Sequence, residues 1–467
     1  MTESSSLLAD RPQPPADTLR NGVPRAADHI RPRRTWRGEF SRLARPVADL
    51  TRCKSALSVF DQAVVSGISF ATSVIIGRTC SKEELGVYFL ALSIVLFARG
   101  VQEQLICVPY IIYCNHRRGD ALASYGGSIL VHQLVLSLLT AACLLGLIGV
   151  LALGIGPAAL APAAWVLLGV APMLLLREFI RQFAFAHLKV VTAIAIDVTV
   201  AGLQLGALLL LAHFDLLSAA SVYLAMGGAC VVACLGWFLA GRQPLRLVRC
   251  RFSADWWHNW AFGKWALASQ LIGCAAPYLM PWVLVLACGE AETGVLAACA
   301  ALVGLSNMFV TGVANYLTPK AAGSFARGGA AELRRVLLKT AALFVVVLGG
   351  FCLLVFVAGD LLAVLVFGEK YLGTGAVLTV LALASLAHAL GITAGNGLWA
   401  MDRPSANFAA DVWSLGVTLV AVFWLVGPLG VLGVAIAELA GMAAGMVVRS
   451  LTLFRLMESA RTQPGVA

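Results

Sequence analysis

Uninterrupted apolar segments, each about as long as a lipid bilayer is thick, fill the chain from residue 56 onward. A helix needs about 20 apolar residues to cross a hydrocarbon core of about 30 Å. Runs such as Leu144–Leu153 and Leu343–Ala358 are continuous and do not alternate with polar residues, which disfavours a transmembrane β-barrel. The sequence therefore predicts an all-α polytopic membrane protein.

The composition excludes the main soluble classes. Only 12% of the 467 residues are charged and 60% are hydrophobic, whereas a soluble domain has roughly 25% charged residues. A soluble enzyme, a disordered chain and a disulfide-stapled secreted module are therefore excluded. The 12 cysteines are scattered through apolar runs without a C-x-x-C pair, so we expect neither a metal site nor a cofactor.

Helical hydrophobicity predicts about twelve transmembrane helices. We expect them at 56–77, 85–113, 124–152, 157–180, 189–212, 218–240, 261–287, 293–318, 336–358, 374–400, 405–427 and 430–453. Cytoplasmic loops carry an excess of Lys and Arg. With a cytoplasmic N-terminus, 30 of the 34 Lys and Arg residues fall on that side, among them Arg177, Arg181 and Arg449, and 3 fall on the other. We therefore expect a multi-pass membrane protein with both termini cytoplasmic.

The first 55 residues are polar and rich in Arg. They lack a short apolar core near Met1, so no cleaved secretory signal is expected, and we interpret 1–55 as a cytoplasmic, largely disordered segment. Residues 40–54 form either a basic helix on the membrane surface or a charged anchor for the first span. The formal net charge of +10 is then explained by the basic residues of the cytoplasmic side, and no nucleic-acid partner is needed to account for it.

The chain repeats itself after six spans. Shifted by 214 residues, Ala195-x-Asp197-Val198 matches Ala409-x-Asp411-Val412, and shifted by 208 residues, Gln62, Cys80, Glu84 and Gly86 match Gln270, Cys288, Glu292 and Gly294. Because six is even, we expect two six-helix lobes of the same orientation, related by a pseudo-two-fold axis along the membrane normal. The expected parts are an N-lobe at 56–241, a cytoplasmic linker at 242–260, a C-lobe at 261–457 and a cytoplasmic tail at 458–467.

Ionisable groups inside the predicted spans are candidate functional residues, because each costs at least about 2.5–3.5 kcal/mol in the bilayer without a partner or water. Arg99 is the only Arg or Lys that we place deep within a span, and Glu103 follows one turn later on the same face. Arg99 either faces a cavity, where its guanidinium grips a phosphate, or forms an internal pair with Glu103. Asn307 matches Arg99, and Gln270 matches Gln62, at the shift of 208 residues. The candidate substrate-binding residues are therefore Arg99, Glu103, Asn307 and Gln270.

Three aspartates and two prolines complete the candidate set. Asp61, near the start of the first span, either reaches the headgroups or is a coupling carboxylate for protons or sodium. Asp197 and Asp411 occupy equivalent places in the two halves, which indicates either a shared structural contact with a neighbouring helix or a place in the cavity. Pro277 and Pro281 should bend the seventh span, as a plain kink or as a hinge.

Short motifs along the membrane domain resemble a known transporter family. They are Leu365-Val366-Phe367-Gly368-Glu369-Lys370-Tyr371, Leu398-Trp399-Ala400-Met401-Asp402-Arg403-Pro404 and Gly430-Val431-Leu432-Gly433-Val434-Ala435-Ile436-Ala437, with Ile75-Ile76-Gly77-Arg78 and Leu85-Gly86-Val87-Tyr88 near the start. The pattern is similar to that of the polysaccharide transporters (O-antigen and exopolysaccharide flippases, Wzx-like) of the multidrug/oligosaccharidyl-lipid/polysaccharide (MOP) exporter superfamily. The resemblance covers roughly residues 56–457.

The resemblance implies an architecture and an activity. Two lobes would enclose a V-shaped cationic cavity and move an undecaprenyl-pyrophosphate-linked oligosaccharide to the periplasmic leaflet by alternating access. The expected partners are this lipid-linked oligosaccharide, membrane lipids, and polysaccharide polymerase or export components. No cofactor is expected, although protons, sodium or the membrane potential can couple such transport.

Two other functions fit the sequence less well. A cation-coupled multidrug exporter of the same fold would favour an acidic, aromatic cavity over Arg99. A membrane polysaccharide polymerase or ligase would need a large outer loop with acids and arginines for general acid–base catalysis, whereas the loops here are short. No G-x-x-x-x-G-K-[ST] loop occurs, so ATP hydrolysis is not expected. The sequence therefore predicts a transporter without catalytic residues.

Overall fold

The computed structural model describes residues 60–240, 245–248 and 251–462, and all of them belong to one compact unit. These described residues are helical, with short connections and without a strand. The expectations for the basic segment 1–55, including the surface helix or anchor at 40–54, lie outside the described residues. So do parts of the linker expected at 242–260 and the last five residues of the tail.

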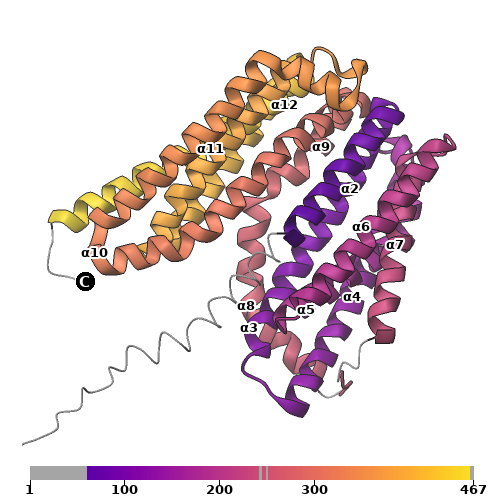
Figure 1. The fold of residues 1–467 in the computed structure, drawn as a ribbon, viewed down its shortest axis with the longest axis horizontal. Helices are drawn as coiled ribbons and strands as arrows, with labels where there is room; N and C mark the ends of the chain where they lie inside the picture. Colours follow the sequence, from indigo (N-terminus) through magenta and orange to yellow (C-terminus); the bar gives the residue numbers. More distant parts are fainter. Residues whose placement is uncertain (1–59, 241–244, 249–250, 463–467) are drawn as a thin grey trace, which may run out of the picture. The chain divides into compact units, whose positions relative to one another are not determined.

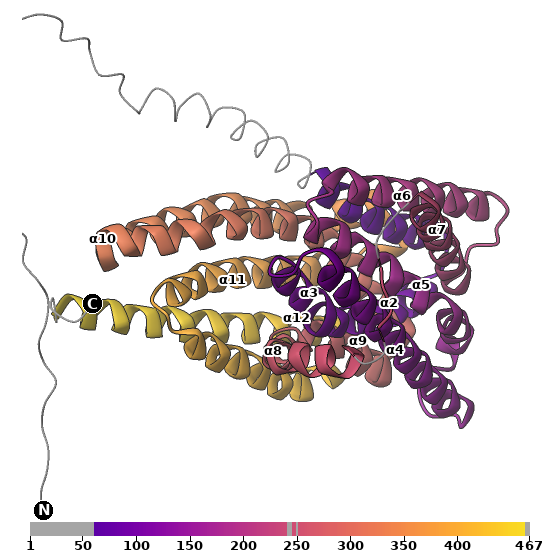
Figure 2. The same ribbon diagram turned by 90° about the horizontal axis from the view of Figure 1, so that it is seen from below.

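Long helices run side by side through the unit (Figures 1 and 2). Their bounds are Phe60–Thr79, α2 Lys82–Gln102, a π-helical turn Glu103–Cys107, α3 Val108–Cys114, α4 Gly119–Ala152, α5 Ala161–Ala186, α6 Val190–His213, α7 Ala219–Ala240, α8 Phe252–Gly273, α9 Ala275–Cys288, α10 Glu290–Phe367, α11 Gly375–Ala400 and α12 Pro404–Thr462. Short 3-10 turns at Ala158–Leu160 and Glu369–Tyr371 precede α5 and α11.

The helices make about twelve membrane crossings, as the sequence predicts. Nine helices among the described residues are long and apolar enough to span a bilayer, and the bent pair α8–α9 adds a tenth. α10 and α12 each contain two consecutive helices, which meet at Gly328–Gly329 and at Gly430. Gly329 and Gly430 have φ values of 58° and 55°, a backbone conformation that glycine adopts at little cost, so the chain reverses direction there.

Two lobes make up the unit: α2–α7 lie together in one and α10–α12 in the other, with α8 and α9 between them (Figure 1). The predicted repeat is visible in equivalent hydrogen bonds. The carboxylate of Glu84 accepts from the Ala219 N–H at 2.6 Å, and that of Glu292 accepts from the Val431 N–H at 3.3 Å. In each half, therefore, the matched glutamate accepts a hydrogen bond from the first turn of the last helix of that half.

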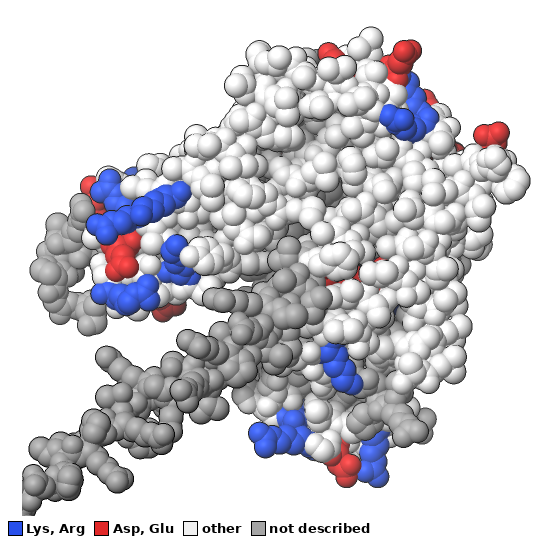
Figure 3. All heavy atoms as spheres, in the orientation of Figure 1, with Lys and Arg blue, Asp and Glu red and all other residues white. Residues whose placement is uncertain are grey.

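The connections between helices fall at two ends of the bundle, because successive helices alternate in direction. The end called here the basic end carries the connections at 115–118, 187–189, 328–329 and 401–403, and the opposite end carries those at 80–81, 153–157, 214–218 and 368–374. Charged side chains gather near the ends, and the surface between them is almost uncharged (Figure 3). Such a belt is what a bilayer requires of a membrane protein.

The two lobes contact each other at the opposite end. α2 and the first half of α10 cross there with backbone against backbone: a Cβ on Gly86 would lie 2.1 Å from the Glu290 carbonyl oxygen, and a Cβ on Gly294 would lie 1.9 Å from the Lys82 carbonyl oxygen. Gly86 and Gly294 are matched residues of the sequence repeat. Only residues without a side chain allow this approach, which is a common way for membrane helices to pack.

Two basic side chains reinforce the crossing at the opposite end. The Arg78 Nε donates to the Val366 carbonyl oxygen at 2.7 Å, and the Lys370 ammonium donates to the Cys80 carbonyl oxygen. Both bonds satisfy carbonyl groups at helix ends, which have no partner within their own helix. The lobes are therefore held together at the end that carries few basic residues.

We expect Gly86→Ala to destabilise the protein, because its new methyl group must displace the Glu290 carbonyl. Overpacking of this kind costs about 1–3 kcal/mol. Gly146→Ala is the matched control, since nothing lies within 4 Å of its added Cβ and alanine favours the helix. The measurement is thermal unfolding of both variants in detergent; equal melting temperatures would contradict the close crossing.

Several helices extend beyond their predicted bounds. The span expected at 157–180 is α5, which continues to Ala186, and the span expected at 293–318 continues to residue 327. α8 begins at Phe252 and not at 261. In α5 and α8 the missed turns carry charged or polar residues with partners in the tertiary structure, such as Asp255, whose carboxylate pairs with Arg117 at 3.1 Å. The hydropathy of the sequence contains no information about such ion pairs, so it ends the predicted helices too early.

Candidate functional site

Six charged side chains meet inside the N-terminal lobe, in the half nearer the basic end. They are Asp61 of helix 60–79, Arg99 of α2, Arg177, Glu178 and Arg181 of α5, and Asp197 of α6, and we call them the ion cluster. Four separate helices thus contribute to one site. Because three guanidinium groups face three carboxylates, the ion cluster as a whole is electrically neutral when all its members are ionised.

Arg181 lies at the centre of the ion cluster. Its Nη2 is 2.6 Å from an Asp61 carboxylate oxygen, its Nε is 2.6 Å from an Asp197 oxygen, and its Nη1 is 3.3 Å from a Glu178 oxygen. Arg177 also pairs with Asp197. Arg181 is only 8% exposed and Asp61 and Asp197 are 1% exposed, so this part of the ion cluster is dry.

Arg99 occupies the edge of the ion cluster. Its Nη2 lies 3.1 Å from a Glu178 oxygen, and its side chain is 36% exposed. The predicted alternative partner, Glu103, is exposed and has no Arg or Lys nitrogen within 4.0 Å among the described residues. Arg99 is therefore the one member that solvent or a ligand can reach readily.

Arg177, Glu178 and Arg181 are the residues that sequence reasoning missed. The sequence placed Arg177 and Arg181 in a cytoplasmic connection and Arg99 alone deep within a span; both expectations are wrong, because α5 continues to Ala186. The aromatic residues Phe179 and Phe183 were a usable signal. They extend the apolar helical pattern beyond residue 180, and both are buried.

Asp61 and Asp197 both belong to the ion cluster, and Asp411 has a similar partner in the other lobe. Asp61 is turned inward to Arg181 and away from the headgroups. Asp411 pairs with Arg449 of the second half of α12. At the repeat shift of 214 residues, Arg177 matches Gly391 and Arg181 matches Gly395, and both glycines belong to α11.

The Arg449 side chain fills the space that these two glycines leave open. A Cβ on Gly391 would lie 3.3 Å from Arg449 Nη1, and one on Gly395 would lie 2.9 Å from Asn407 Oδ1 and 3.6 Å from Arg449 Cδ. Each lobe thus gives its matched aspartate a guanidinium, from α5 in one lobe and from α12 in the other. The sequence counts Arg449 among the basic residues of the cytoplasmic side, although it falls within the span expected at 430–453; in the structure it pairs with Asp411 inside the lobe.

Two cavities meet beside the ion cluster. The first, of about 150 Å³, is lined by every member of the ion cluster except Asp61 and Arg181, and we call it the cluster cavity. The second, of about 300 Å³, lies between helix 60–79, α2 and the first half of α10, so it is the inter-lobe crevice. Ser69, Tyr88 and Leu92 line both cavities. The ion cluster is therefore open toward the space between the lobes.

Gln270 lies near Arg99, and Asn307 does not lie in this site. The Gln270 side chain lies beside the Tyr278 hydroxyl, and that hydroxyl is 3.3 Å from the Cβ that Gly100 would carry. Asn307 is exposed and lines neither the cluster cavity nor the inter-lobe crevice. The structure thus places Gln270 beside Tyr278, whose hydroxyl lies against α2 next to Arg99, and places Asn307 outside both cavities.

The seventh span is bent at the place that Pro277 predicts. α8 ends at Gly273 and α9 begins at Ala275, with an angle of 47° between them. Pro277 has no N–H for the Gly273 carbonyl four residues earlier, and its ring clashes with that carbonyl. A Cβ on Gly273 would lie 3.8 Å from the Asp411 carboxylate, so Asp411 lies beside the bend. Pro281 lies within α9.

Solved transporter structures share this fold. An inward-facing structure of a multidrug resistance MATE family transporter of the MOP superfamily matches with a TM-score of 0.72 and 15% identity, over 86% of this chain and 96% of that chain. An outward-facing structure of a multidrug resistance MATE family transporter matches with a TM-score of 0.57 and 14% identity, over 87% of this chain and 95% of that one. The fold is therefore that of a MATE transporter with two lobes.

A third neighbour is a MOP superfamily transporter from Pyrococcus furiosus, for which a binding pocket of reverse polarity suggests a different function. It matches with a TM-score of 0.61 and 14% identity, over 87% of this chain and 95% of that chain. Neither a family model nor a curated protein sequence matches the chain.

The structure of the chain is more similar to the inward-facing than to the outward-facing MATE structure. The TM-score is higher for the inward-facing than for the outward-facing structure, and the lobes of this chain touch at the opposite end through Gly86 and Gly294. The fold thus occurs in an inward-facing and an outward-facing state among its neighbours.

Proposed function

We propose that the chain is a flippase that moves an undecaprenyl-pyrophosphate-linked oligosaccharide across the bacterial inner membrane for exopolysaccharide or O-antigen export. The fold supports a transporter, and the sequence resemblance to polysaccharide flippases favours this cargo over a drug. In this proposal the basic end is cytoplasmic, and the substrate enters between the lobes from that side. The observation that carries the proposal is the position of Arg99.

Arg99 is available to an anionic substrate at little cost to the rest of the ion cluster. It is 36% exposed, whereas the other members are 16% exposed or less, and among the described residues its ion pair is with Glu178 alone. A diphosphate presents several oxygens to a planar guanidinium and binds it in two-point fashion. Glu178 keeps Arg181 at 3.3 Å when Arg99 turns to the substrate, so no buried carboxylate loses its last partner.

The inter-lobe crevice offers a sugar both hydroxyl groups and an aromatic wall, the latter formed by Phe70, Tyr88 and Phe89. On helix 60–79 its wall carries the hydroxyls of Ser66, Ser69 and Ser73, and on α10 it carries the small side chains of Ala297 and Ala301. Hydroxyls both donate and accept hydrogen bonds, as sugar hydroxyls do. Small residues opposite them leave room for bulky groups. We therefore assign the glycan to the crevice and the diphosphate to Arg99, with Gln270 nearby.

Asp61, Asp197 and Asp411 support the lobes in this proposal and leave any coupling to other groups. Each is paired with an arginine, so a proton or a sodium ion would have to displace a guanidinium to bind there. The bend at Pro277 is proposed as the hinge, because it lies between Arg99 of one lobe and Asp411 of the other.

The proposal is tested by deleting the gene and analysing lipid extracts. We expect undecaprenyl-pyrophosphate-linked oligosaccharide to accumulate on the inner face and surface polymer to be lost, with both effects reversed by the wild-type gene. The rival function is a multidrug exporter, which the MATE fold favours. An unchanged lipid pool together with new drug sensitivity would support that rival and refute the flippase.

A further inference from the structure

A groove of about 630 Å³ lies between the two halves of α10, away from the ion cluster. Phe309 and Val313 of the first half and Leu343 of the second half form apolar parts of its wall. Lys320, Arg335 and Lys339 line it as well, and all three are exposed. We call it the α10 groove.

The helix geometry places these two parts of the α10 groove at different depths in the bilayer. With a rise of 1.5 Å per residue, Phe309 lies about 29 Å and Lys320 about 45 Å along the helix from its start at Glu290. Measured back from Phe367, Leu343 lies about 36 Å and Arg335 about 48 Å away. Because the hydrocarbon core is about 30 Å thick, the apolar wall lies near its edge and the cations lie in the headgroup layer.

The cations of the α10 groove carry unneutralised positive charge. Within the described part of the chain, no carboxylate lies within 4.0 Å of Lys320, Arg335 or Lys339. The Lys320 ammonium donates to the Tyr316 hydroxyl at 2.9 Å and lies 4.7 Å from the centre of its ring. The one acid in the lining, Glu332, folds back toward Gly328 at the turn.

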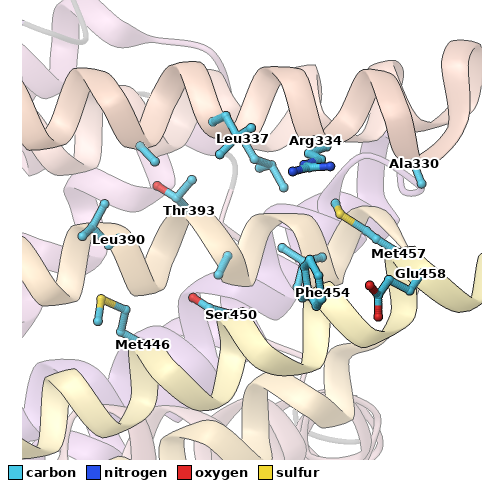
Figure 4. Close-up of a pocket in the computed structure, with 14 residues that line it drawn as sticks. Ala330, Arg334, Leu337, Leu390, Thr393, Met446, Ser450, Phe454, Met457 and Glu458 are labelled. Atoms are coloured by element: carbon cyan, nitrogen blue, oxygen red, sulfur yellow. The ribbon is translucent and has the colours of Figure 1, made fainter.

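Two other grooves show that this charge is not a general property of the helix packing. The groove between α2 and α4 in the other lobe, of about 180 Å³, has only uncharged lining residues such as Phe97, Leu139 and Cys143. On the other side of the second half of α10, a groove of about 520 Å³ has Arg334 and Glu458 on facing helices (Figure 4). Its charges are therefore balanced, one base against one acid.

We propose that the α10 groove binds an anionic membrane lipid. Its phosphate lies among Lys320, Arg335 and Lys339, and its acyl chain lies against Phe309, Val313 and Leu343. Basic side chains at the headgroup level attract anionic lipids, and the apolar wall below them gives the chain a partner. This site is separate from the one proposed for the transported substrate and does not depend on that proposal.

The test compares two triple variants of the full-length protein in a neutral detergent. Lys320→Gln/Arg335→Gln/Lys339→Gln removes the charge of the α10 groove, and Arg327→Gln/Arg334→Gln/Arg403→Gln removes the same charge elsewhere at the basic end. We expect phosphatidylglycerol to raise the melting temperature of the wild type and of the control by several degrees, and that of the groove variant by less than half as much. Phosphatidylcholine should change none of them. An equal response of both variants would overturn the proposal.

Two further measurements use the wild type alone, in case the groove variant does not fold. A phosphatidylglycerol with a photoreactive headgroup should crosslink to peptides within 309–343, and crosslinks concentrated elsewhere would refute the site. Inorganic pyrophosphate without a lipid should give little stabilisation. A rise equal to that from phosphatidylglycerol would show a site for soluble anions and would overturn the assignment to a lipid.

Discussion

Arg181→Leu is expected to be among the most destabilising substitutions in the protein. Arg181 contacts Asp61, Glu178 and Asp197 within 3.3 Å and is 8% exposed. Without it, three carboxylates share the guanidinium groups of Arg99 and Arg177, and Asp61 loses its only ion pair among the described residues. Leaving a buried charge without its partner costs about 3–5 kcal/mol. Thermal unfolding of the purified protein measures the loss.

Two further variants separate charge balance from packing. Arg246→Leu removes a guanidinium from an ion pair with Asp120 in which the side chains are 65% and 90% exposed, and it should cost about 1 kcal/mol or less. Asp61→Asn in the Arg181→Leu background restores neutrality and should recover part of the lost stability, which a double-mutant cycle quantifies. The same melting temperature for Arg181→Leu and Arg246→Leu would refute the buried ion cluster.

Arg99→Ala is expected to leave the fold intact and to reduce transport by about tenfold or more. The fold survives because Glu178 keeps Arg181, and because Arg99 is the most exposed member of the ion cluster. Transport slows because the substrate diphosphate loses its guanidinium. A hydrogen bond to a charged group contributes about 1.5–3 kcal/mol, which corresponds to about a tenfold loss or more. Surface polymer in a deletion strain that carries the variant measures the effect.

The controls for Arg99→Ala address folding and chemistry in turn. Membrane insertion and melting temperature should match those of the wild type, which separates this variant from Arg181→Leu. Arg99→Lys keeps the charge but not the two-point geometry, and it should retain part of the activity. Arg246→Ala should restore polymer fully. Polymer at the wild-type level from Arg99→Ala would remove Arg99 from the substrate site, whatever the cargo is.

Part of the site could be predicted from the sequence, and the reason is local. Arg99 and Asp61 are charges within long apolar runs, so their cost in a bilayer identifies them without a structure. Arg177 and Arg181 lie at the end of an apolar run, where charged residues are equally typical of a loop between two helices. Only their contacts with Asp61 and Asp197, which are distant in the chain, show that they lie inside the protein.

The sequence by itself determined the helical membrane fold, the approximate number of crossings and the repeat, because each depends on apolar length and spacing along the chain. Tertiary structure alone decided which charges neutralise one another, and it placed Arg449 over Gly391 and Gly395 where the other lobe has its own arginines. The physical reason is that an ion pair depends on distance in space, and residues from separate helices come within 4 Å only after the helices have packed.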